Sequence, residues 1–230
     1  MLSPVLAVTI TAIAATVPSI TSPLTVQLIR RCPPDAACAP IEVVQEMKRE
    51  TERIWFALGV QLNWVELSST DPADHPLPDL VVMFEENPRP VVGGSVLQGL
   101  VLGSMYQPAT LCDAGVAHLW VAHVRRHVEP VYVHGVPLIS GPTHFARLAF
   151  ARALGRALAH EVGHYLLGPG HAPYGLMRAK FSAHELLDTP AFGICGLDSK
   201  SRSRLIARRL ERADRQCGTP DAPMRGASQP

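Results

Sequence analysis

Two histidines four residues apart stand in the string His160-Glu161-Val162-Gly163-His164. On an α-helix, residues at this spacing lie about 40° apart around the axis and about 6 Å apart along it, so both imidazoles can reach one metal ion. Glu161 flanks the same face, where its carboxylate can accept a proton from a water on the metal without being a ligand. The glycine keeps the space between the two ligands uncluttered. The string therefore predicts a metal centre with Glu161 as a general base.

A catalytic zinc site commonly takes three protein ligands and leaves the fourth position for water, so a third ligand is needed. His171 follows the string after the turn Gly168-Pro169-Gly170, which returns the chain towards the same face. Glu185, further along in Ala183-His184-Glu185-Leu186-Leu187-Asp188, is the alternative ligand. The sequence favours His171, because closing a short loop through a glycine turn costs less conformational entropy than bringing in a residue from a distant element.

The predicted helix that carries the string follows Thr143 and runs to Leu167. Thr143 is a suitable N-cap, and the segment is rich in Ala, Leu and Arg and contains no Pro, which favours a helix. Pro169 cannot continue the hydrogen-bond ladder, and the glycines on either side of it allow a reversal. The sequence thus predicts a long helix that ends just after the second histidine.

The remaining segments predict the elements around this helix. Alternating, β-rich patterns predict strands at residues 24–30, 60–67, 79–84, 101–106 and 116–124. Helical spacing of apolar residues predicts helices at residues 41–58 and 199–212. This order predicts an α+β fold with a mixed, mostly N-terminal β-sheet, one crossover helix, a long active-site helix and a C-terminal helix.

Chain length suggests one domain with an extra segment at each end, because 230 residues is close to the usual size of a single domain. We assign the domain to residues 21–215. Residues 1–20 carry no charge and include a short apolar run, which predicts a secretory signal without a basic start, or alternatively a hydrophobic first strand. A flexible tail is expected at residues 216–230.

The formal net charge of +1 at pH 7 gives no electrostatic indication of a nucleic-acid partner. The basic face of the predicted helix at residues 199–212 is typical of a solvated surface. The N-terminal apolar run is too short for a membrane span, so no stable membrane insertion is expected. Partners must therefore be inferred from the metal centre, and the sequence does not indicate the oligomeric state.

The string, followed by Gly168, His171 and then Gly175-Leu176-Met177, resembles the metzincin clan of zinc peptidases. In that clan the glycine and the third ligand lie seven and ten residues beyond the first histidine. Here one extra residue precedes Gly168. The resemblance implies a zincin-like fold, a Zn²⁺ ion held by His160, His164 and His171, and a Met-turn at Met177.

The resemblance also implies a function, namely hydrolysis of a peptide or protein substrate with Glu161 as the base. Substrate in such enzymes commonly lies as an extra strand along a sheet edge, and residues 116–124 are the segment expected there. A zinc-binding module that holds peptide without cutting it, and a gluzincin-type peptidase with Glu185 as third ligand, remain alternatives. The presence of Glu161 favours the enzyme, because a structural zinc site does not need that base.

The chain has five cysteines, at positions Cys32, Cys38, Cys112, Cys195 and Cys217. In an exported protein they would allow one or two disulfides and leave one thiol. Cys32 and Cys38 are close enough in sequence to close a small loop. Cys217-Gly218-Thr219-Pro220-Asp221 resembles the inhibitory switch of matrix metallopeptidase propeptides, in which a thiolate takes the water position on the metal. A disulfide with Cys195, or a flexible tail, is the favoured alternative.

Overall fold

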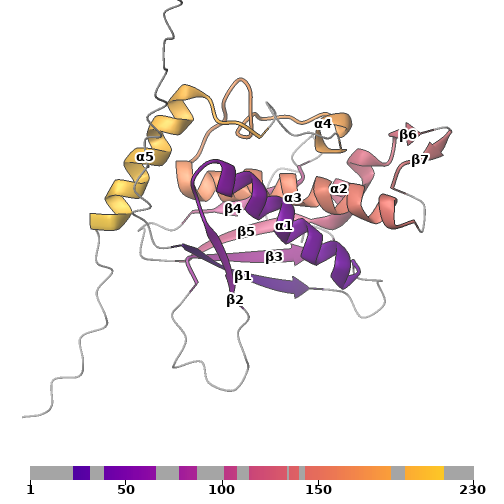
Figure 1. Cartoon of the computed structure of the whole chain (residues 1–230), viewed down its shortest axis with the longest axis horizontal. Helices are drawn as coiled ribbons and strands as arrows, with labels where there is room; N and C mark the ends of the chain where they lie inside the picture. The colour runs from indigo at the N-terminus through magenta and orange to yellow at the C-terminus, as the bar shows by residue number, and fades with distance from the viewer. Residues whose placement is uncertain are drawn as a thin grey trace, which may run out of the picture.

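The computed structural model describes residues 23–31, 39–65, 78–86, 101–107, 114–133, 135–139, 143–187 and 195–214. The strands are β1 (Leu24–Arg31), β2 (Leu62–Val65), β3 (Leu80–Glu85), β4 (Gly103–Tyr106), β5 (Gly115–Trp120), β6 (Tyr132–Val133) and β7 (Val136–Pro137). The helices are α1 (Ile41–Ala57), α2 (Val121–Val128), α3 (His144–Leu167), α4 (Ala183–Leu187) and α5 (Ser199–Asp214) (Figure 1). The expected signal, the C-terminal tail with Cys217, the pair Cys32 and Cys38, and Cys112 lie outside the described residues. Cys195 is a free thiol.

The main sheet has the strand order β2-β1-β3-β5-β4. β1 pairs in parallel with β2 and β3, and β3 pairs in parallel with β5. β4 runs antiparallel to β5 and forms an edge of the sheet. Parallel neighbours need a crossover connection, which α1 supplies between β1 and β2. The fold is therefore α+β with a mixed sheet, as the sequence predicted, and the structure adds that most of the strand pairs are parallel.

Residues 116–124 were expected to form a strand at the sheet edge, and the structure corrects this. β5 ends at Trp120 and is paired on one side with β3 and on the other with β4. The chain then enters α2, in which Val121, Val124 and Val128 are buried at helical spacing. The edge position belongs instead to β4, whose place depends on pairing between distant segments.

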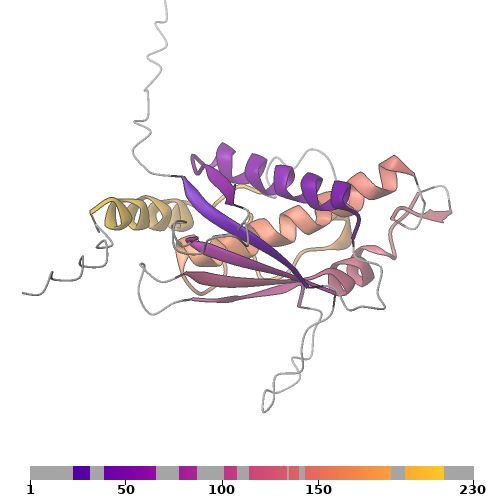
Figure 2. The same cartoon turned by 90° about the horizontal axis from the view of Figure 1, so that it is seen from below.

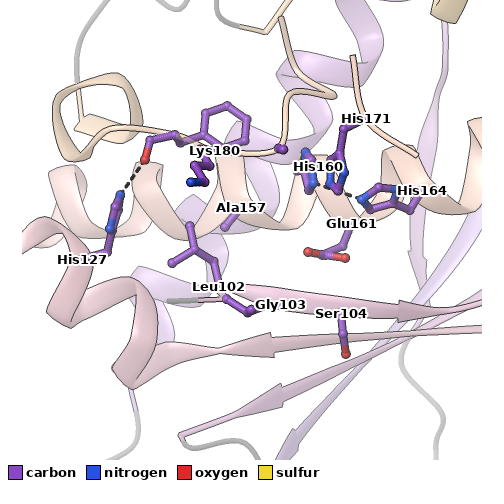
Figure 3. Close-up of a pocket in the computed structure, with 13 residues that line it drawn as sticks. Leu102, Gly103, Ser104, His127, Ala157, His160, Glu161, His164, His171 and Lys180 are labelled. Atoms are coloured by element: carbon purple, nitrogen blue, oxygen red, sulfur yellow. Dashed lines mark hydrogen bonds between the residues drawn. The ribbon is translucent and has the colours of Figure 1, made fainter. Parts of the chain in front are cut away.

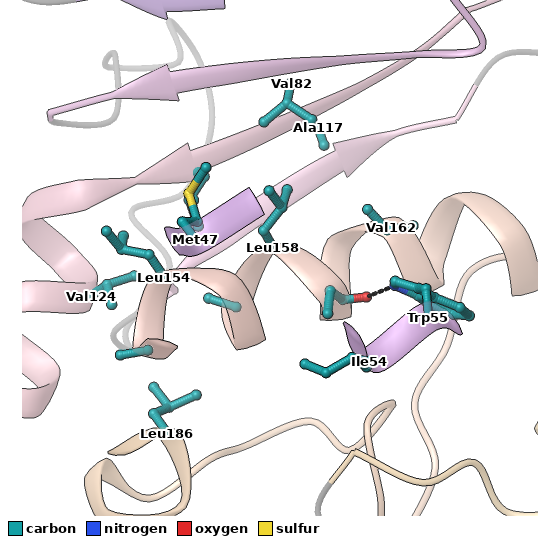
Figure 4. Close-up of a cluster of buried hydrophobic side chains, with 14 of the residues drawn as sticks. Met47, Ile54, Trp55, Val82, Ala117, Val124, Leu154, Leu158, Val162 and Leu186 are labelled. Atoms are coloured by element: carbon teal, nitrogen blue, oxygen red, sulfur yellow. Dashed lines mark hydrogen bonds between the residues drawn. The ribbon is translucent and has the colours of Figure 1, made fainter. Parts of the chain in front are cut away.

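α1 and α3 lie on the same face of the sheet (Figures 1 and 2). Met47 of α1 and Leu158 of α3 are fully buried beside Val82 and Ala117 of the central strands (Figure 4). α3 is buried around most of its circumference, since it contacts α1, the sheet, α2, α4 and α5. Such a helix is apolar on all sides rather than along one stripe. Even so, no helix of the described segments is both long and apolar enough to cross a membrane.

α1 fixes the position of α3 through close contacts along a row of small residues. Thr51 Oγ1 donates a hydrogen bond to Gly155 O at 3.1 Å, and one turn further Trp55 Nε1 donates to Ala159 O at 3.1 Å. A Cβ atom at Gly155 would lie 2.7 Å from Glu50 Cβ, so the two backbones approach more closely than an alanine would permit. The residues that follow in α3 are thereby held at a defined place over the sheet.

Candidate metal centre

The C-terminal part of α3 carries the histidine string, and both ends of the helix have the predicted caps. Thr143 accepts a hydrogen bond from the backbone N of Ala146 at its start. Gly168 ends the helix with φ of 88° and donates its N–H to His164 O at 3.0 Å. This positive φ favours glycine, and the turn that follows leads the chain to His171.

The structure brings the three predicted histidines together. One ligand nitrogen from each of His160, His164 and His171 lies within 4.8 Å of the other two, and the three side chains converge in Figure 3. The Nε2 atoms of His160 and His164 are 3.1 Å apart. Two imidazole nitrogens at about 2.0–2.1 Å from a tetrahedral zinc ion would be separated by roughly 3.3 Å. The donor set therefore fits zinc.

A hydrogen bond that His160 donates to the loop after α3 orients its imidazole. Its Nδ1 lies 2.7 Å from the carbonyl oxygen of Leu176. Since a carbonyl only accepts, Nδ1 carries the proton and Nε2 presents its lone pair to the centre. Burial lowers the pKa of His160 to about 4. Burial, together with neighbouring His171, also lowers the pKa of His164. Both imidazoles are thus neutral at pH 7, as binding a metal ion would require.

Glu161 lies beside the three histidines with its carboxylate facing β4 (Figure 3). The residue is 6% exposed, and within the described residues its carboxylate has no hydrogen bond or ion pair. Burial raises the pKa of this carboxyl group to about 8. A Cβ atom at Gly103 would lie 2.9 Å from Glu161 Oε1. Because Gly103 of β4 has no side chain, the carboxylate of Glu161 fits beside the strand.

Met177 packs against α3 at Gly163. A Cβ atom at Gly163 would overlap Met177 Sδ and lie 3.4 Å from Trp55 Cζ2. Gly163 therefore makes room for Met177 and Trp55, and not for the space between the two ligands as the sequence suggested. Ala172 N donates to Met177 O at 2.7 Å, which closes the loop between His171 and the methionine.

Glu185, the alternative ligand, lies outside this group. Its carboxylate accepts hydrogen bonds from Arg178 Nη1 at 2.5 Å and from the backbone N and Oγ of Ser182 at 2.8 and 2.9 Å. The metal-binding cluster among the described residues consists of the three histidines alone. Glu185 instead joins the start of α4 to the loop that carries Met177.

The centre opens into a cavity of ≈ 530 Å³. Its lining residues are Val101, Leu102, Gly103, Ser104, His127, Ala157, His160, Glu161, His164, His171, Ala179, Lys180 and Phe181. The sequence pattern gave no sign that His127, Leu102, Lys180 or Phe181 line the site, because none of these residues has a characteristic spacing from the string. They join the site only through the packing of β4, α2 and the loop after α3.

No protein-family model matches the sequence, and no curated protein is similar to it. Among solved structures, the chain is similar to a zinc-dependent peptidase from Methanocorpusculum labreanum (strain Z), with 15% sequence identity and a TM-score of 0.44. The similarity covers 78% of this chain and 99% of that chain. A likeness this distant does not indicate an activity for the present chain, whose function must be inferred from its own site.

Proposed function

We propose that this protein is a zinc-dependent peptidase that hydrolyses peptide bonds, with His160, His164 and His171 as the ligands and Glu161 as the general base. One observation carries the proposal: three imidazoles converge beside a buried carboxylate that has no hydrogen-bond or ion-pair partner among the described residues. A structural zinc site usually fills its fourth position with protein. Here the fourth side faces a cavity large enough for part of a peptide.

Zinc, when bound, would supply a Lewis acid for the scissile carbonyl and lower the pKa of the attacking water. Glu161 accepts the proton of that water and passes it to the leaving amine. Its burial raises the pKa to about 8 in the absence of metal, and a nearby positive charge would favour the ionised form that acts as a base. The hydrogen bond from His160 to Leu176 O keeps the first ligand in the tautomer that presents Nε2.

The edge strand β4 supports binding of an extended substrate. β5 occupies one side of β4, and Gly103 of β4 lines the cavity together with Leu102. A peptide in extended conformation can pair its backbone with such an edge and leave its side chains to neighbouring pockets. Because this mode does not require a free chain end, the enzyme would be an endopeptidase.

Zinc content and hydrolysis measured together test the proposal. The purified chain should bind one zinc ion and degrade fluorescent casein, a chelator should abolish the degradation, and added zinc should restore it. His171→Ala should lose the metal, whereas Glu161→Gln should keep it and lose hydrolysis. His144→Gln and Glu42→Gln, both at exposed positions, serve as matched controls and should behave as wild type.

Two results would contradict the proposal. A chain that binds no zinc would exclude the metal centre, and a Glu161→Gln variant that cleaves at the wild-type rate would exclude the assigned base. Zinc binding and peptide binding without any cleavage by the wild type would instead identify a zinc-containing peptide-binding module.

A further inference from the structure

The cavity extends beyond the metal ligands along α3, and its second end has a different composition. Ala157, one helical turn before His160, forms the floor there, and Leu102 and Phe181 form apolar walls. His127 and Lys180 complete this end. Figure 3 shows Leu102, Ala157, Lys180 and His127 on one side of the three histidines, with Lys180 between the histidines and His127.

The walls of this second end are held in place by contacts. The Phe181 ring meets the His160 ring edge-on, with the centroids 5.5 Å apart, and the guanidinium of Arg178 lies 4.7 Å from the Phe181 centroid. His127 Nε2 is 2.8 Å from the carbonyl oxygen of Phe181. Since a carbonyl only accepts, this nitrogen donates and is already engaged. Among the described side chains that line this end, Lys180 therefore supplies the lysine cation that could meet a ligand.

The charges around the cavity are unevenly distributed. Of the described residues that line it, Glu161 is the acidic one, at the metal end, and Lys180 carries the lysine ammonium at the other end. Within the described part of the chain, Lys180 forms no ion pair, and Figure 3 shows its side chain directed into the cavity. An ammonium group has three donors and no acceptor, so it selects a ligand that accepts hydrogen bonds and carries negative charge.

We propose that this end of the cavity binds a carboxylate of the peptide substrate and that Lys180 is the specificity-determining residue. The inference rests on the proposed function, because it concerns the peptide that the same site would hold. Lys180 is exposed, and the half-buried Leu102 and Phe181 line the same end of the cavity, so the ion pair would form in contact with solvent and draw its selectivity from charge. A lysine or arginine side chain of the substrate would instead meet a like charge. The carboxylate can belong to an acidic side chain next to the scissile bond or to the C-terminus of the peptide.

Peptide binding to zinc-loaded Glu161→Gln tests this proposal without requiring catalysis. One pair of fluorescent peptides differs by Glu or Gln beside the scissile bond and carries an amidated C-terminus. A second, neutral pair differs by a free or an amidated C-terminus. Fluorescence anisotropy should give about fivefold tighter binding for the carboxylate member of at least one pair, as expected for an ion pair of about 1 kcal/mol at an exposed lysine. The responding pair identifies the source of the carboxylate.

Substitutions at Lys180 then test whether this residue causes the preference for a carboxylate. Adding Lys180→Met should reduce the preference to within about twofold, Lys180→Glu should reverse it, and Lys180→Arg should retain it. Lys48→Met is the matched control, because Lys48 lies on α1 over the Trp64 ring and does not line the cavity. The preference should also weaken as salt is added.

Equal affinity for both members of both pairs would overturn the proposal, as would a preference that Lys180→Met leaves unchanged. Failure of the proposed function gives a different pattern. In that case the wild type cleaves none of the four peptides. Any Lys180-dependent preference measured by anisotropy persists and supports a carboxylate-binding cavity.

Discussion

Glu50 of α1 and Glu161 of α3 are both buried, but the groups that surround their carboxylates differ. Glu50 of α1 is 7% exposed and Glu161 of α3 is 6% exposed. Glu50 accepts two hydrogen bonds from Arg53, each 2.9 Å long, and one from Arg156 Nε at 3.1 Å. Burial acts to raise the pKa of Glu50, but Arg53 and Arg156 outweigh it, so the pKa is lowered. Within the segments that the structure describes, Glu161 pairs with no cation, and burial raises its pKa to about 8.

The difference separates a carboxylate that holds the fold from one that is free to react. Arg156 is fully buried and also donates to Glu185 O at 2.6 Å, so with Glu50 it joins α1, α3 and the start of α4. A buried carboxylate without a partner contributes no comparable stability. Such a group with a perturbed pKa, beside possible metal ligands and open to a cavity, marks a candidate functional site. About one helical turn of α3 separates the two environments.

The largest expected effect distinguishes the two glutamates by activity. Glu161→Gln should lower kcat by about 10²- to 10⁴-fold, the usual contribution of a general base, while zinc content stays the same. Glu50→Gln should leave kcat per folded molecule within a few-fold of wild type, since it keeps an acceptor for Arg156 and lies outside the cavity. Peptide hydrolysis normalised to bound zinc measures both. Similar losses of kcat in the two variants would remove the distinction.

Stability should respond in the opposite order. Glu50→Ala should lower the free energy of unfolding by about 3 kcal/mol, because it leaves the buried charge of Arg156 with a missing partner. The double variant Glu50→Leu and Arg156→Met should recover most of that loss, since both charges are gone. Urea unfolding of metal-free protein gives these values. A Glu161→Gln variant destabilised as much as Glu50→Ala would contradict the comparison.

The metal-free protein should also show the difference in its pH dependence. The pKa of Glu161 is raised from 4.5 to about 8, so the folded state binds a proton that the unfolded state lacks, and stability falls as pH rises from about 4.5 to about 8. His160, whose pKa is lowered to about 4, acts oppositely, and its contribution is lost as pH falls from about 6.5 to about 4. Glu161→Gln should remove the contribution of Glu161 to this pH dependence, about 3.5 kcal/mol between pH 5 and pH 8. Urea unfolding at both pH values measures it, and an unchanged decline in the variant would be inconsistent with an unpaired Glu161.

The sequence predicted the parts of the site that depend on local structure. Helical spacing places His160 and His164 on one face, and the Thr143 cap and the Gly168 turn set the ends of α3 from neighbouring residues alone. Most of the strands and both amphipathic helices were likewise predicted to within a few residues, because alternation and helical periodicity are local signals. These elements suffice to bring His171 back to the helix.

The remaining features depend on contacts between distant segments. The order of β4 and β5 in the sheet is decided by pairing across the fold, so an alternating pattern at residues 116–124 could not reveal which strand is the edge. The small hairpin of β6 and β7 lies where no strand was predicted, and α2 takes the place of the end of the strand predicted at residues 116–124. Lys180 and Phe181 reach the cavity only through the path of the loop after α3. No local pattern encodes these arrangements.

The smallest expected effect concerns Glu185, a carboxylate whose surroundings resemble neither those of Glu50 nor those of Glu161. Its side chain is 31% exposed and its partner Arg178 is 19% exposed, and hydrogen bonds from Ser182 and Arg178 outweigh partial burial and lower its pKa. Exposed or half-exposed pairs usually contribute at most about 1 kcal/mol. Glu185→Gln should therefore change the free energy of unfolding by no more than that and leave zinc stoichiometry and kcat close to wild type. A metal ligand would behave differently, because its loss removes the ion. Full zinc occupancy in Glu185→Gln beside an empty site in His171→Ala would thus assign the third ligand to the turn after α3, whereas loss of zinc in both variants would require the loop and α4 to rearrange around the metal.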